Sequence, residues 1–248
     1  MTDTLLDKTL HLMDVSVADF TGMVPPPQAI PFHTSFVYRH VERLPQQAIV
    51  QKLARIPSGL RAARLLMTQG LFQEQSALQR IADELSDDVF FLSIPLLSGG
   101  LTTLHQEYLN AFFQEDFDAA TGKPLAQDRP MIPRKKIRAY IANSEYGTED
   151  PSGAIHAART VHKTDSGFVH ASSPHIMDTY GGNPPRFHVS GMLGTVREAQ
   201  YSNTIYNYFY RSLAAFGVAA IVLGSNSHLH ATRGVMDELD LAMAAAEQ

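Results

Sequence analysis

The sequence predicts an all-α protein: a multi-helix bundle with short loops and one ordered irregular segment around residues 172–195. Apolar residues recur at spacings of three, four and seven, which is the pattern of helices that bury one face. Alternation of apolar and polar residues, typical of strands, is found only in RFHVSGM at residues 186–192. Prolines and glycines separate the periodic segments, and the short connections favour largely antiparallel helices around one core.

Composition indicates an ordinary globular protein. The 248 residues are 44% apolar and 18% charged, and no apolar run approaches the roughly 18 residues of a membrane span. The N-terminus lacks the basic and apolar regions of a secretory signal, so we expect a cytoplasmic protein that does not enter membranes. The absence of cysteine excludes disulfides, thiolate metal sites and cysteine nucleophiles. A net charge of −5 gives no long-range attraction for polyanions, so indiscriminate nucleic-acid binding is not expected.

The first 34 residues are predicted to form an N-terminal arm that packs on the body, and residues 35–248 a single helical domain. The arm combines a short helix over residues 5–13 with a stiff, proline-rich stretch at 23–31. From Ser35 onward, helices that end at Pro45, Pro57 and Gly70 are expected, because proline and glycine interrupt the helical pattern there.

The remaining helices follow the same signals. The clearest covers residues 71–94, where six apolar side chains form one stripe before Pro95 and SGG end the helix. Asp150 followed by Pro151 is a typical helix start. The other predicted helices cover about residues 101–117, 134–146, 151–171, 196–223 and 228–246.

The predicted helix from residue 151 carries a basic stripe that can exchange protons. With about 100° between successive residues, one face collects His156, Arg159, Lys163, Ser166 and His170. His156 and His170 would lie about 21 Å apart along the axis, too far to serve one metal ion. The stripe therefore either follows an extended ligand or is a solvated face.

The irregular segment FVHASSPHIMDTYGGNPPRFHVSGM, residues 168–192, is the strongest candidate for a functional site. Its turn is permitted by glycine and asparagine and stiffened by prolines. Loops held on rigid helices are where binding and catalytic groups concentrate. The alternative is a structured connector whose histidines bond to backbone groups. The side chains that suit a site are His170, His175, Tyr180, Arg186 and His188.

Two charged stretches have both a structural and a functional interpretation. In LQRIADELSDDVFF, Arg80 can pair with Glu84 four residues later. If another helix covers this face, its acids need cations, which the histidine segment could supply; otherwise the face is solvated. The basic stretch RPMIPRKKIR, residues 129–138, is either a local RNA-binding patch or a solvated helix start. The four acids concerned are Asp83, Glu84, Asp87 and Asp88.

RLLMTQGLFQEQSALQRIADELSDDVFFL, followed far downstream by TDSGFVHASSPHIMDTYGG, resembles the HEPN superfamily, small helical domains found in RNases, toxins and antiviral systems. The resemblance covers about residues 58–220 and implies an all-helical homodimer with a role near RNA. Active HEPN nucleases carry arginine, four to six residues and then histidine. The nearest equivalent here is Lys163, six residues and His170, so lysine stands where arginine is expected.

Under this resemblance, His170 would act as general base or hydrogen-bond donor at a scissile phosphate. Lys163 and Arg159 would stabilise charge, and His175 completes the catalytic set. The candidate substrate-binding residues are Arg80, Tyr180 and Arg186.

Two other classes of function stay open. One is a metal-dependent or small-molecule enzyme, because imidazoles and carboxylates together suit a divalent transition metal such as zinc, iron or manganese. Its ligands would be His170, His175, His188, Glu84 and Asp87. The other is a non-catalytic scaffold or partner protein, since the tyrosine-rich YSNTIYNYFYRSL at residues 201–213 suits an interface as well as a core. The chain has no Walker loop, dinucleotide fingerprint, HExxH or GxSxG, which argues against those enzyme classes.

Overall fold

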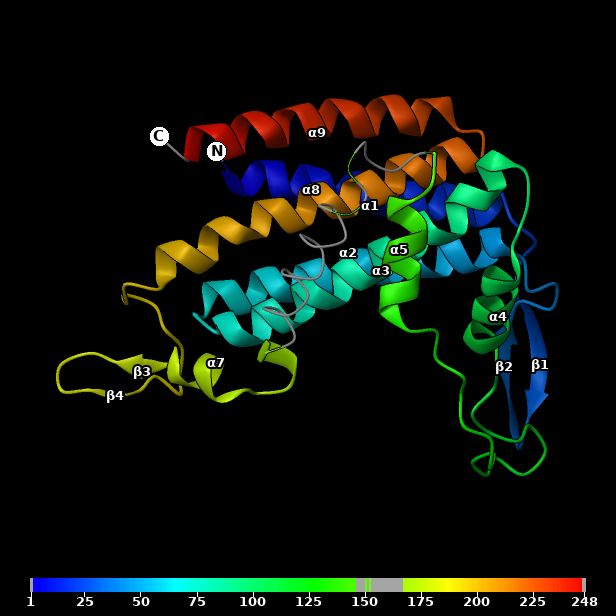
Figure 1. Ribbon diagram of the computed structural model, residues 1–248, viewed down its shortest axis with the longest axis horizontal. Coiled ribbons are helices and arrows are strands. Elements are labelled where there is room, and N and C mark those ends of the chain that lie inside the picture. The colour runs from blue at the N-terminus through cyan, green and yellow to red at the C-terminus, as the bar shows by residue number, and fades with distance from the viewer. Residues whose placement is uncertain (1, 146–149, 151, 153–166, 247–248) are drawn as a thin grey trace.

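The structure of the protein is a computed structural model, which describes residues 2–145, 150, 152 and 167–246 (Figure 1). The described residues are mostly helical and include two short antiparallel sheets, so the all-α prediction is confirmed. None of the described helices is both long and apolar enough to cross a membrane. The long helices of the bundle are α1 (Thr2–Gly22), α2 (Pro45–Thr68), α3 (Phe72–Ser98), α8 (Glu198–Val222) and α9 (Asn226–Ala246).

Helix α1 is more than twice as long as the predicted helix at residues 5–13, and it packs on α2, α8 and α9. Leu6, Met13 and Phe20 are fully buried, which shows that the apolar face continues beyond the predicted end. Burial of this face stabilises the additional turns, because most helical stability in proteins comes from tertiary packing. The N-terminal helix is thus part of the core.

A β-hairpin follows where a helix was predicted from Ser35. Strand β1 (Gln28–Phe32) pairs with β2 (Ser35–Arg39), from Gln28 opposite Arg39 to Phe32 opposite Ser35. Two residues close the turn, and the first of them, His33, has φ 51°, as tight hairpin turns require. The helix prediction is wrong here because strands this short show little periodicity, whereas their aromatic and β-branched residues favour a strand.

Two prolines lie inside helices that they were predicted to end. Pro57 is buried within α2, and Pro95 is buried in the last turn of α3. Each lacks an N–H and so removes one helical hydrogen bond. The helix continues through Pro57 because Ile56 and Leu60, on either side of it, are fully buried. At the other end of α3, Gly99 closes the helix with φ 105°.

The smaller elements cover the sides and ends of the bundle. Helix α4 (Thr103–Phe112) and helix α5 (Arg134–Ala142) are shorter than predicted, and α5 packs on α3. The segment before α8 is irregular, as predicted, apart from α7 (Ser173–Met177), β3 (Tyr180–Gly181) and β4 (Arg186–Phe187). Figure 1 shows the two hairpins projecting at opposite ends of the bundle. Most of the predicted helix at 151–171, including His156, Arg159, Lys163 and Ser166, lies outside the described residues.

The main core contains a buried histidine that the sequence did not single out as functional. His105 is fully buried, and its ring stacks on Phe91 with centroids 4.1 Å apart. Its Nδ1 accepts the backbone N–H of Thr102 at 3.2 Å, so Nε2 carries the proton and donates to the carbonyl of Phe91 at 3.1 Å. Burial lowers the pKa of His105, although the bond to Phe91 opposes this. The ring is therefore a neutral part of the core.

Candidate functional site

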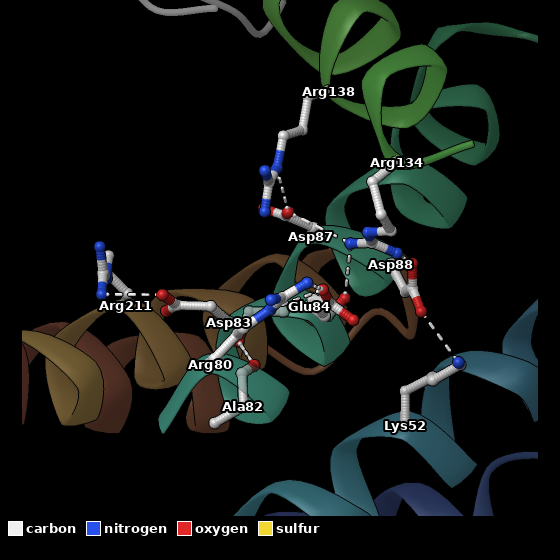
Figure 2. Close-up of polar contacts among 11 residues, drawn as sticks. Lys52, Arg80, Ala82, Asp83, Glu84, Asp87, Asp88, Arg134, Arg138 and Arg211 are labelled. Atoms are coloured by element: carbon white, nitrogen blue, oxygen red, sulfur yellow. Dashed lines mark hydrogen bonds and ion pairs between the residues drawn. The ribbon is translucent and has the colours of Figure 1, made fainter. Parts of the chain in front are cut away.

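Four of the five acids of α3, Asp83, Glu84, Asp87 and Asp88, meet cations from several elements of the bundle (Figure 2). The sequence suggested that histidines of the irregular segment could supply these cations. In the structure they are arginines and one lysine instead. The predicted pair of Arg80 with Glu84 is present at 2.8 Å. Arg211 of α8 lies 2.9 Å from Asp83. The other pairs join Arg138 to Asp87 at 2.8 Å, Arg134 to Asp87 at 3.2 Å and to Asp88, and Lys52 to Asp88 at 2.8 Å.

Asp88 is the most enclosed carboxylate of this network. Its side chain is 7% exposed and accepts hydrogen bonds from Lys52 of α2 and Arg134 of α5. Tyr108 of α4 also bonds to it, and burial together with the charge of Asp88 raises the pKa of that hydroxyl. Burial lowers the pKa of Arg134, but the charges of Asp88 and Asp87 outweigh this and leave it raised. Asp88 therefore joins three helices to α3.

Two of the predicted metal ligands, Glu84 and Asp87, belong to this ion network. Glu84 and Asp87 are held by arginines of the network, which compete with any cation for their oxygens. Across residues 2–145 and 167–246, no three histidine, aspartate or glutamate side chains are grouped closely enough to hold a metal ion. The structure thus does not bring Glu84 and Asp87 together with His170, His175 and His188.

The irregular segment is fixed to the bundle by a close backbone crossing. The N–H of Met192 donates to the carbonyl of Gly70, in the turn between α2 and α3, at 2.8 Å. Gly191 has φ 112°, and a Cβ there would overlap the carbonyl oxygen of Gln69. Beside this crossing, Met192 is buried in a small cluster with Phe72 and Tyr201, whose rings stack 5.4 Å apart. The segment is therefore packed directly against the turn between α2 and α3.

His175 takes part in this attachment. Its Nδ1 lies 2.7 Å from the Ser172 hydroxyl, and its ring meets the edge of Phe168 with centroids 4.5 Å apart. The His175 ring fills the space over Gly167, where no Cβ would fit. The backbone carbonyl of His175 accepts a hydrogen bond from the side-chain amide of Gln73 of α3. These contacts support the connector interpretation for His175, which was predicted as a catalytic residue.

The hairpin of β3 and β4 gathers three of the predicted residues. Tyr180 pairs with Phe187, and their rings lie edge to face with centroids 4.9 Å apart and exposed fractions of 44% and 46%. Arg186 is the next residue on β4 and is exposed. His188 and Tyr180 line a surface pocket of about 430 Å³ beside the hairpin. Tyr180 and His188 thus share one pocket and Arg186 is exposed on the neighbouring strand, while Arg80 belongs to the α3 network.

Arg197 is a residue of this pocket that the sequence analysis missed. It precedes α8 and lies 2.6 Å from Asp178, which lines the same pocket. The two are nineteen residues apart, so no helical spacing links them. His170 is exposed, and Lys163 and Arg159 lie outside the described residues.

Other cations that were missed have a signal in the sequence. Arg134 and Arg138 are four residues apart and so share one helical face, which contacts Asp87 and Asp88 of α3. Two helices that place such faces together can form a ladder of ion pairs. The basic stretch at residues 129–138 therefore engages α3 through these two arginines.

The chain matches no protein-family model, and no curated protein or solved structure matches it significantly. The resemblance to the HEPN superfamily therefore stays a prediction.

Proposed function

We propose that the protein binds single-stranded RNA through the exposed face of the β3–β4 hairpin and the pocket beside it. The observation that carries this proposal is the exposed aromatic pair of Tyr180 and Phe187 next to Arg186. Unpaired bases stack on such rings, and arginine can contact both a base and a phosphate. The HEPN resemblance, which implies a role near RNA, favours the same class of ligand.

The charges around the hairpin support a short, local contact. Among the described residues Arg186 makes no ion pair, so its guanidinium is available to a phosphate. The protein as a whole is negative and gives no long-range attraction. Stacking should therefore supply most of the affinity. Contact with one or two phosphates would give a logarithmic salt slope of only about −0.7 to −1.4.

The test is fluorescence anisotropy with a labelled single-stranded RNA of eight nucleotides. The double variant Tyr180→Ala/Phe187→Ala should weaken binding at least about tenfold, because a stacked base contributes roughly 1–3 kcal/mol. The matched control is Phe36→Ala/Tyr38→Ala, which removes the edge-to-face pair of the other hairpin. Equal losses in the two variants, or no binding by the wild type, would contradict the proposal.

Three finer properties belong to the same proposal. Cleavage by His170 with Lys163 and Arg159 would appear as shortened RNA on a gel, and His170→Ala should abolish it while binding persists. A homodimer, implied by the HEPN resemblance, would be seen as a doubled mass in sedimentation. A cytoplasmic location would place the protein with cellular RNA.

A further inference from the structure

We infer that a second site, in the cavity between α3, α4 and α5, binds a small monocarboxylate with an apolar body. The cavity has a volume of about 230 Å³ and lies beside Asp88. Typical ligand pockets begin near 300 Å³, so this one suits a ligand of about ten non-hydrogen atoms. It is independent of the hairpin, which lies at an end of the bundle (Figure 1).

The cavity is apolar along most of its walls and charged at one end. Its apolar lining includes Leu85 of α3, Phe112 of α4 and Ile137 of α5. Met131 lines it while being 76% exposed, which places this side chain at the mouth. Such a cavity favours a ligand whose apolar part is buried against the apolar walls and whose single polar group lies at the charged end.

The charged end has donors to spare. The Nζ of Lys52 lies 4.6 Å from the ring centroid of Phe112 and uses one hydrogen bond on Asp88, although an ammonium can donate three. The Nε of Arg134 is buried and has no hydrogen-bond partner among the described residues. A buried donor without an acceptor is costly, so an acceptor that reached it would bind favourably.

The charge of the cavity lining selects the sign of the ligand. Among the described side chains that line the cavity, three are cations, Lys52, Arg129 and Arg134, and two are carboxylates, Glu84 and Asp88. The lining therefore has one positive charge in excess. A monoanion compensates it, whereas an amine would add a like charge and an alcohol would leave the excess in place.

The first experiment compares three ligands of one chain length on the full protein: monomeric octanoate, octan-1-ol and octylamine. Octanoate at ten times its Kd should raise the melting temperature by roughly 3–6 °C, and the other two should bind at least about tenfold more weakly. Calorimetric titration gives the three Kd values. Binding of the alcohol or the amine as tight as that of octanoate would overturn the choice of a carboxylate.

The second experiment locates the site. Met131→Trp should block the mouth without touching the ion network, so octanoate binding should fall at least about tenfold with an unchanged melting temperature of the free protein. The matched control is Met177→Trp, at an exposed methionine outside the cavity, which should bind like the wild type. Unchanged binding in Met131→Trp would overturn the proposed site. RNA binding should be unaffected by either octanoate or Met131→Trp, so the two proposals fail separately.

Discussion

The ion network of α3 and the segment at residues 168–197 are both rich in charged or titratable groups, but the fold uses them differently. In the network, Asp83, Glu84, Asp87 and Asp88 of α3 each have a cation within the bundle. On the hairpin, Arg186 is exposed on β4 and His188 lines the pocket just after it, and neither forms an ion pair within the described chain. Charges that packing removes from water must find partners inside the protein, whereas charges on a projecting loop stay available to a ligand.

Removal of one carboxylate from the buried network gives the largest effect. Asp88→Asn leaves Lys52 and Arg134 enclosed without their shared anion, and we expect a loss of about 3–5 kcal/mol in the free energy of unfolding. Urea denaturation measures it. The control is Asp116→Asn, which breaks an exposed pair with Arg129 and should cost at most about 1 kcal/mol. Similar losses in both variants would contradict the distinction between buried and exposed pairs.

The attachment of the segment should be the next most sensitive feature. Gly191→Ala forces a Cβ against the carbonyl of Gln69 at a φ of 112°, and about 1–3 kcal/mol of stability should be lost. Hydrogen exchange around Met192 should accelerate. Gly194→Ala is the control, since Gly194 has φ 75° but open space around it, and the loss there should be smaller. Equal losses would mean that backbone strain alone, without the crossing, accounts for the effect.

The buried histidine of the core, His105, should make the stability of the protein depend on pH. The pKa of His105 is lowered by burial, so below its unfolded value of about 6.5 the unfolded chain binds more protons than the folded one. Stability should be complete above pH 6.5 and fall as the pH drops, by at most about 1.4 kcal/mol per pH unit for this residue. Urea denaturation of wild type and His105→Gln at pH 7.5 and 5.5 isolates it. A pH-dependent loss of the same size in His105→Gln would assign the effect to other groups.

The smallest expected effect concerns the hairpin charge. Arg186→Ala should weaken RNA binding roughly threefold to fivefold without changing stability, because Arg186 is exposed and forms no ion pair with the described residues. Anisotropy titrations and thermal melting measure the two quantities. Arg39→Ala removes an arginine of the other hairpin that is bound to Glu115, and RNA binding should not change. A weaker RNA complex in Arg39→Ala would show that any surface arginine contributes.

Most of the helical frame could be predicted from the sequence, because long amphipathic segments carry a strong periodic signal. Helices α3, α8 and α9 begin within two residues of their predicted starts. The β1–β2 hairpin was missed because five residues are too few to separate the two periods. The continuation of α2 through Pro57 was missed because it depends on burial, which a local pattern does not encode.

The position of the candidate site in the chain could be predicted, but the residues that contact one another across the fold could not. Tyr180, Arg186 and His188 could be proposed together because they are close in the chain, and the hairpin does gather them. Partners distant in sequence, such as Lys52 and Arg134 for Asp88, depend on how helices cross. The roles of Lys163 and Arg159 stay predictions.

The contact of Gly191 with the turn at Gly70 has a consequence for engineering the chain. Short turns between helices ordinarily accept extra residues, since lengthening a surface connection has a small entropic penalty. Here added residues between α2 and α3 would displace the backbone on which residues 191–193 rest. A tag or fused domain is better inserted near Gln127, in the exposed loop before α5.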